Sequence, residues 1–168
     1  KQNRPIFKNK ILIEGSALFL VGPIGTFFSR LANFLEKNNI KIYKLSFPYH
    51  EYGFSKESRI FYEDYISKFK QFLEKIILKK KIKHIFMYGN VLIPHKDALA
   101  LNKELKAKGY DVECHIFELG YLRPNFVTLE KKGVNYDSSF ILGKEFYVKQ
   151  TPYKNFPTPI GQGLRVRK

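Results

Sequence analysis

The stretch ALFLVGPIGTFF, Ala17–Phe28, decides the fold class of this chain. Five apolar residues run into the turn Gly22–Gly25, and a helical pattern of apolar residues begins directly after it. A short apolar run that ends in glycines and continues as an amphipathic helix is typical of a strand–helix unit in a parallel sheet. Thr26 is the predicted N-cap of this helix. The apolar face of the helix comprises Phe27, Phe28, Leu31, Phe34 and Leu35.

The same unit repeats along the chain. Ile40–Leu45 alternates with period two, as a half-buried strand does. A polar, aromatic loop over 48–58 leads into a long helix whose apolar face runs from Phe61 through Tyr65 to Ile76. The other predicted strands are 17–21, 84–88 and 112–117, and a further helix is predicted over 95–108 with Gly109 in the C′ position.

Four strand–helix repeats with short connections predict a Rossmann-like α/β fold, a parallel sheet with helices on both faces. Ligands of such sheets bind where the strands end at their carboxyl side. Four loops meet this condition: Gly22–Thr26, Phe47–Ser58, Gly89–His95 and Glu118–Asn125.

The ends of the chain lack this pattern. Residues 124–139 show neither a helical nor a clear strand period, and 151–168 are rich in Pro and Gly and end in basic residues. We therefore expect a lead-in over 1–16, a Rossmann-like domain over 17–140, and an irregular linker or arm over 141–168 that leads to a second domain. The chain is expected to be a piece of a longer protein.

Composition limits the class of partner. The chain has 168 residues, 30 Lys+Arg against 15 Asp+Glu, a formal charge of +15 and 44% hydrophobic residues, which excludes a disordered acidic polypeptide. A basic surface attracts nucleic acid, phosphates, anionic lipid and acidic sugars alike. Zinc-finger, helix-turn-helix and RNP patterns are missing, so no nucleic-acid partner is expected. The lysine run 75–83 is either a solvated helix end or a phosphate-binding patch.

Cysteine usage and hydropathy give the expected location. Cys114 is the single cysteine and cannot form an internal disulfide. Neither a signal peptide nor a run of about 18–20 apolar residues is present, which favours a cytoplasmic protein.

Two candidate sites precede the fourth strand. The Gly22–Gly25 turn can direct backbone amides at an anion, or can be a tight turn without a ligand, since it matches no complete phosphate-binding motif. His95 opens a helix after a strand-end loop, where its ring could donate to a phosphate or carboxylate. His84 and His115 fall in or beside strands and are expected to be structural, and no metal-ligand spacing is found.

The residues after the fourth strand carry the most chemistry. Glu118, Tyr121 and Arg123 place a carboxylate, a phenol and a guanidinium within six residues. The carboxylate can serve as nucleophile or base, and the guanidinium can bind a carboxylate or phosphate in bidentate fashion. The alternative is a Glu118–Arg123 ion pair that only shapes the loop.

Several strings together resemble one family. They are Gly22–Phe28, Tyr88-Gly89 with Pro94-His95, Phe117–Glu130, and Gly133-Val134-Asn135 with Ser138. Over about residues 17–140 the chain resembles the capsule polysaccharide biosynthesis and export proteins of the KpsS type, which are bacterial retaining β-Kdo transferases. The resemblance implies the N-terminal, acceptor-side half of a GT-B-like glycosyltransferase with two Rossmann-like domains.

The resemblance also implies a reaction and a location. Such an enzyme transfers Kdo, an acidic sugar, from CMP-β-Kdo to a phosphatidylglycerol-type lipid, and so starts the capsule linker. It would need no cofactor or metal, would associate peripherally with the inner face of the inner membrane, and would have capsule biosynthesis or export proteins as partners. The alternative is a non-catalytic basic module that docks on anionic membrane or on export partners.

The implied residue roles follow from retention of configuration, which suggests two inversions through a covalent intermediate. Glu118 is the candidate nucleophile, with Glu130 behind it. Arg123 would hold the Kdo carboxylate or a lipid phosphate, and His95 a phosphate oxygen. Related transferases often carry an acidic pair where this chain has Glu118-Leu119. The implied substrate-binding set is Gly22, Gly25, Thr26, His95, Gly120, Tyr121, Arg123, Thr128, Asn135 and Ser138.

Overall fold

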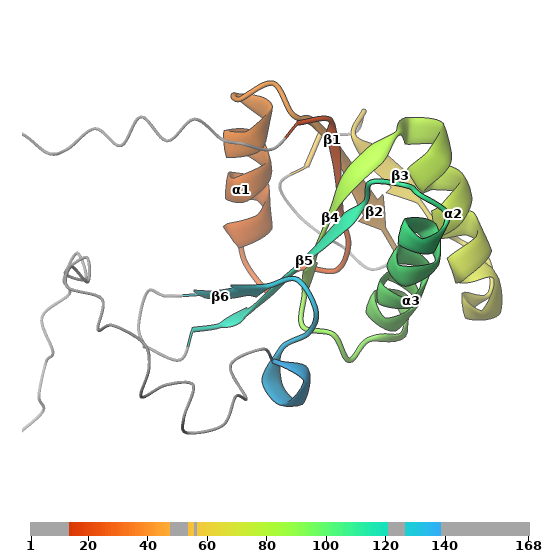
Figure 1. Cartoon of the computed structure of the whole chain (residues 1–168). Coiled ribbons are helices and arrows are strands. Elements are labelled where there is room, and N and C mark those ends of the chain that lie inside the picture. The colour runs from red at the N-terminus through yellow and green to blue at the C-terminus, as the bar shows by residue number, and fades with distance from the viewer. Residues whose placement is uncertain (1–13, 48–53, 56, 121–126, 139–168) are drawn as a thin grey trace, which may run out of the picture.

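The computed structural model describes residues 14–47, 54–55, 57–120 and 127–138, and in them six strands form one sheet (Figure 1). The strands are β1 Ser16–Phe19, β2 Lys41–Ser46, β3 Arg59–Phe61, β4 Ile82–Tyr88, β5 Glu113–Leu119 and β6 Val127–Glu130. Their order in the sheet is β3-β2-β1-β4-β5-β6. The first five pair in parallel, and β6 pairs antiparallel to β5. This confirms the Rossmann-like α/β class.

Helices cover both faces of the sheet. The described helices are α1 Phe27–Glu36, α2 Phe69–Lys80 and α3 Ile93–Ala107. Figure 1 shows α1 on one face and α2 with α3 on the other. Each face has its own apolar core. Phe19 of β1 stacks on Phe86 of β4 with ring centroids 4.9 Å apart, and Phe28 of α1 closes over them at 5.2 Å from Phe19. Burial of a Phe side chain contributes about 1.5–3 kcal/mol.

Strand β2 is more deeply buried than its sequence predicts. The alternation over Ile40–Leu45 predicts a half-buried strand, whereas every residue of β2 after Lys41 is buried. The strand lies between β3 and β1 and has helices on both faces, so both of its faces are removed from water. Lys44, whose burial was not predicted, is fully buried and lies on the same face of the strand as Ile42.

The predicted long helix over 61–76 is wrong at its start. Residues Arg59–Phe61 form the short edge strand β3, a single 3-10 turn follows at Ile66–Lys68, and α2 begins at Phe69. Phe61 and Tyr65, placed on the apolar helix face by their spacing, are exposed. Tyr62 is buried instead, and its ring packs edge-on against Phe69 at 5.2 Å.

The expectation of irregular structure over 124–139 is also wrong in part. Val127–Glu130 forms β6, and Asn135–Asp137 forms a 3-10 turn. The strand alternates with the usual faces reversed: Val127 and Leu129 are exposed, while Glu130 is buried. A search for strands whose apolar residues face the core therefore misses β6. Residues 141–168, expected to be a linker, lie outside the described part of the chain.

The remaining predicted elements are confirmed. The strands at 84–88 and 112–117 correspond to β4 and β5, and the helix over 95–108 corresponds to α3. Gly109 follows α3 with a φ of +85°, the left-handed conformation expected at C′. Across the described residues, no helix combines the length and the apolar character needed to cross a bilayer.

Candidate active site at the carboxyl edge of the sheet

Backbone hydrogen bonds join the segments at the carboxyl ends of β1, β4 and β5. The Tyr88 amide donates to the Val21 carbonyl at 3.1 Å, and the Gly89 amide donates to the Phe117 carbonyl at 2.8 Å. These bonds continue the parallel ladder past the last residues of β1 and β4. We call the surface where these strands and their following loops meet the carboxyl edge.

Glu118 is the best-positioned carboxylate at the carboxyl edge. Its Oε1 accepts a hydrogen bond from the Leu119 amide at 2.8 Å, and its Oε2 accepts one from Asn135 Nδ2 at 3.3 Å. A Cβ added at Gly89 would lie 3.8 Å from Glu118 Oε2, so the end of β4 passes close to the carboxylate. Three segments distant in sequence thus converge on one half-buried carboxylate. Hydrogen bonds to both oxygens fix its orientation, as a nucleophile or base requires.

The turn that supplies Asn135 is itself tied to the end of β4. Asn90 Nδ2 donates to Asp137 Oδ2 at 2.8 Å. A Cβ at Gly133 would lie 2.4 Å from Asp137 Cβ, so only glycine fits there without rearrangement. Asn135 has a φ of +55°, a left-handed conformation that Asn tolerates better than most residues. Sequence reasoning predicted Asn135 and missed Asn90 and Asp137, whose pairing depends on tertiary structure alone.

Glu130 lies behind Glu118 on the same face of the sheet. In the antiparallel register Glu118 is opposite Thr128 and Glu130 is opposite Ile116, which makes the two glutamates diagonal neighbours. Glu130 is buried, and its Oε1 accepts a hydrogen bond from Ser138 Oγ at 2.6 Å. This bond fastens the 134–138 turn to β6, which is a structural task. The catalytic role of Glu130, the second candidate after Glu118, stays a prediction.

His95 is fully buried at the start of α3, beneath the ends of β1 and β4. Burial, together with the smaller effect of the Lys44 ammonium, lowers the pKa of its imidazole to about 4, although the nearby Gly89 and Val21 backbone groups oppose part of the shift. Neither ring nitrogen has a partner at hydrogen-bond geometry in the described structure. The ring is therefore neutral at pH 7 and lies under the carboxyl edge, where its predicted contact with a phosphate stays untested.

Lys44 is a buried cation that sequence reasoning missed. Its Nζ donates to the Leu20 carbonyl at the end of β1 and lies 5.8 Å from the centroid of the Phe54 ring. The carbonyl and the ring face compensate part of the cost of burying the charge. A lysine inside the otherwise apolar run of β2 was the signal that could have found it.

The Gly22–Thr26 turn lies at the end of β1, with β4 between it and β5. A Cβ at Gly22 would lie 2.6 Å from the Phe28 ring, so packing alone accounts for this glycine. Gly25 and Thr26 are exposed, and Thr26 is at the N-cap position without a capping bond from its side chain. An anion-binding role of the turn stays a prediction.

Of the other predicted site residues, two lie in the described part of the chain and two lie outside it. Thr128 Oγ1 lies 3.5 Å from the Leu119 carbonyl and so faces the end of β5. Gly120 is buried directly after β5. Tyr121 and Arg123 lie outside the described residues, as does the proposed Glu118–Arg123 ion pair.

Comparison with known proteins relates the sequence of this chain to one group of proteins. The family model for capsule polysaccharide biosynthesis proteins matches residues 90–167, which begin just after β4 and include the Glu118–Ser138 region. The chain is 31% identical over 172 residues to the capsule polysaccharide modification protein LipB of Neisseria meningitidis serogroup A, covering 95% of this chain and 40% of LipB. The chain is a relative of the capsule polysaccharide biosynthesis proteins.

A second relative extends this result. The capsule polysaccharide export protein KpsS of Escherichia coli is 31% identical over 157 residues, covering 92% of this chain and 38% of KpsS. The resemblance drawn from the sequence motifs is thus confirmed. The chain spans about two fifths of the length of these curated relatives. No solved structure matches it.

Proposed function

We propose that this chain is the acceptor-side part of a capsule polysaccharide glycosyltransferase that moves Kdo from CMP-β-Kdo to a phosphatidylglycerol-type lipid. The observation that carries the proposal is the Glu118 carboxylate, half-buried at the carboxyl edge and oriented by the Leu119 amide and Asn135. The relationship to capsule proteins supplies the substrate class. The enzyme would work at the cytoplasmic face of the inner membrane with capsule biosynthesis or export proteins as partners.

Glu118 acts in this proposal as the nucleophile of a double displacement. One carboxylate oxygen attacks the anomeric carbon of Kdo, the bond from that carbon to the phosphate of CMP breaks, and CMP leaves with the electron pair. The lipid hydroxyl then attacks the same carbon and loses its proton to water, the bond from that carbon to the Glu118 oxygen breaks, and Glu118 is released as a carboxylate. Two inversions give net retention. The Asn135 amide holds the oxygen it bonds, which leaves the carboxylate in one orientation for attack.

The test is transfer by the full-length enzyme. Incubation with CMP-Kdo and phosphatidylglycerol lipid should give a Kdo-lipid detectable by mass spectrometry. Glu118→Gln keeps the shape of the side chain and removes its nucleophilicity, so turnover should fall by at least about 10³-fold. Glu104→Gln, which alters an exposed glutamate on α3 paired with Lys70, should keep the wild-type rate. Full transfer by Glu118→Gln would eliminate Glu118 as nucleophile, and absence of product across several lipids would refute Kdo transfer.

A second candidate function is supported by lysines at the opposite edge of the sheet. A shallow hollow there is lined by Gly15, Ser16, Lys41, Tyr43, Lys79, Lys80 and Lys81. The ammonium groups of Lys41 and Lys80 lie 5.6 Å and 5.3 Å from the centroid of the Tyr43 ring. Exposed lysines near an anionic bilayer contribute about 1 kcal/mol each. A docking module without catalysis would use this surface.

Vesicle co-sedimentation separates the two candidates. The triple change Lys79→Gln, Lys80→Gln, Lys81→Gln should weaken binding to phosphatidylglycerol vesicles if the hollow docks on membrane, and binding should fade with added salt. A matched control, Lys96→Gln, Lys103→Gln, Lys106→Gln, removes the same charge from exposed positions of α3. Equal loss in both triples would mean that overall charge, and no particular surface, drives the binding.

A further inference from the structure

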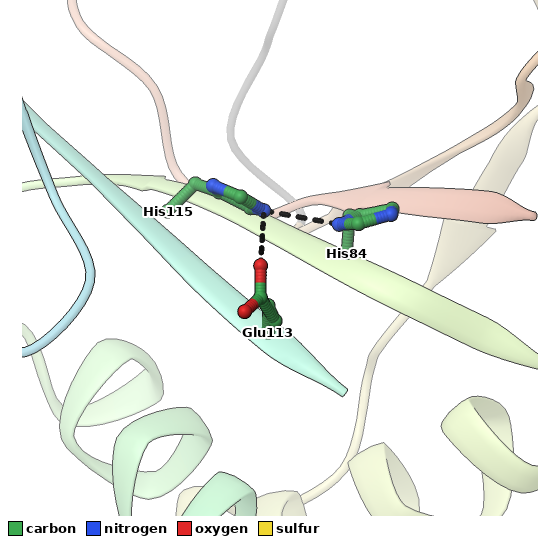
Figure 2. Close-up of side chains that lie close together, drawn as sticks. All are labelled: His84, Glu113 and His115. Carbon is green, nitrogen blue, oxygen red and sulfur yellow. Dashed lines mark hydrogen bonds and ion pairs between the residues drawn. The ribbon is translucent and has the colours of Figure 1, made fainter. Parts of the chain in front are cut away.

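Three metal-binding side chains meet on the sheet at the end opposite the candidate active site (Figure 2). His84 comes from β4, and Glu113 and His115 come from β5. The parallel register sets His84 directly beside Glu113, and His115 is two residues further along the same face of β5. One ligand atom of each side chain lies within 4.8 Å of the other two.

The distances suit a small cation. His84 Nδ1 lies 3.0 Å from His115 Nε2, and His115 Nε2 lies 4.0 Å from Glu113 Oε2. A tetrahedral zinc ion, with ligands about 2.0–2.2 Å away, holds its ligand atoms about 3.3–3.5 Å apart. Side-chain rotations that move these atoms by less than about 1 Å would form three corners of such a site. We propose that His84, His115 and Glu113 bind one Zn²⁺ ion, with water as the fourth ligand.

An outer hydrogen bond already orients one ligand. His84 Nε2 lies 3.2 Å from the Glu14 carbonyl, and because a carbonyl only accepts, Nε2 carries the proton. This leaves the lone pair on His84 Nδ1, the atom that faces the cluster in Figure 2. Histidines that bind metals typically donate their second N–H to a carbonyl or carboxylate in this way. Without a metal, His115 Nε2 donates a hydrogen bond to His84 Nδ1. When the ion binds, His115 carries its proton on its own Nδ1, and the ion takes the place of the proton between the two rings.

The neighbouring groups determine which side chains can bind the ion and which metal they favour. Cys114 points to the opposite face of β5, where its Sγ lies 4.0 Å from the Ala98 carbonyl, so no thiolate of β5 joins the cluster. Lys131 Nζ lies 2.9 Å and 3.0 Å from the two Glu113 oxygens and competes with the ion for them. Two imidazoles and one carboxylate favour zinc over magnesium or calcium, which prefer oxygen ligands. The site would tie β4 to β5, and the hydrogen bond from His84 to the Glu14 carbonyl would tie it to the segment before β1.

The experiment uses the untagged protein, stripped with a chelator and titrated with Zn²⁺ and, separately, Co²⁺. We expect one equivalent of either metal, and a tetrahedral Co²⁺ absorption without a thiolate-to-cobalt band. His115→Gln should lower the affinity by more than about 100-fold, beyond the effect of losing an outer-shell partner. Absence of bound metal, or a thiolate band, would overturn the proposal.

A pair of lysine variants tests the site without disturbing the core. Lys131→Gln frees Glu113 and should tighten Zn²⁺ binding by about two- to fivefold, the usual worth of an exposed ion pair. Lys108→Gln removes another exposed lysine, one that pairs with Glu74 at 3.2 Å, and should leave the affinity unchanged. Equal affinities for the two variants would show that Glu113 is not a ligand, even if His115→Gln fails to fold.

Discussion

Two polar side chains at opposite edges of the sheet, Glu118 and Ser16, differ in what they bond. At the carboxyl edge, Glu118 accepts from the Asn135 side chain across 17 residues of sequence. At the amino edge, where β1, β2 and β4 begin, the Ser16 side chain bonds backbone carbonyls instead. Ser16 Oγ donates to the carbonyls of Lys80 and Lys81 at 3.0 Å and 2.7 Å.

This difference separates chemistry from structure in the same sheet. A side chain that satisfies a backbone carbonyl is committed to holding the chain, because its loss leaves a buried polar group unpaired. A carboxylate held by another side chain keeps lone pairs and solvent access for a reacting group. The basic residues Lys79–Lys81 gather at the structural edge, and the carboxylates Glu118 and Asp137 gather at the edge proposed for catalysis.

The largest expected effect is a loss of folding stability at acidic pH, caused by the buried His95 at the carboxyl edge. Its pKa is lowered from 6.5 to about 4 by burial and by Lys44, so between these values the unfolded chain binds a proton that the folded chain does not. Stability is therefore complete above pH 6.5 and falls as the pH drops toward 4. At 1.36 kcal/mol per pKa unit the loss reaches about 2–3 kcal/mol by pH 4.5.

Urea unfolding of the wild type and of His95→Gln at pH 7.5 and 4.5 measures this loss. The variant lacks the titrating ring, so its stability should decline by about 2–3 kcal/mol less over the same interval. An equal loss of unfolding free energy in the two proteins would show that the folded state does not favour the neutral form of His95.

The next effect concerns the turn after β1. An alanine Cβ at position 22 would lie 2.6 Å from the Phe28 ring, and forcing the ring away costs about 1–3 kcal/mol. Gly22→Ala should therefore destabilise the fold in the wild-type background and much less in Phe28→Ala, as a double-mutant cycle by chemical denaturation would measure. Additive free energies would instead assign Gly22 a role apart from packing, such as binding an anion.

The sequence predicts the parallel core of the fold because strong apolar runs and glycine turns are local signals. The β1–α1 unit, β4, β5 and α3 were all expected at nearly their observed positions. Edge strands were missed because β3 has three residues and β6 turns its apolar residues outward. Glu118 was named as a site residue from its position at the end of a strand, and Asn135 from the family motifs.

Register explains most of what was missed. His84 and Glu113 are 29 positions apart, and their contact depends on how far β4 is shifted along β5, which hydrophobic periodicity does not determine. The same holds for Asn90 with Asp137, which meet only once β6 and its following turn have folded back. The burial of Lys44 was not predicted, because an alternating pattern does not reveal that helices cover both faces of the strand.

The smallest expected effect belongs to the amino edge. Ser16 is buried, and its hydroxyl bonds two carbonyls at the end of α2, where helical carbonyls lack partners within the helix. Ser16→Ala should lower the free energy of unfolding by about 1 kcal/mol, without changing Kdo transfer in the full-length enzyme. Ser67→Ala, at an exposed position, should change stability by less than about 0.5 kcal/mol. Loss of transfer in a stably folded Ser16→Ala would contradict the division between a structural edge and a catalytic edge, because it would make the amino edge part of the reaction.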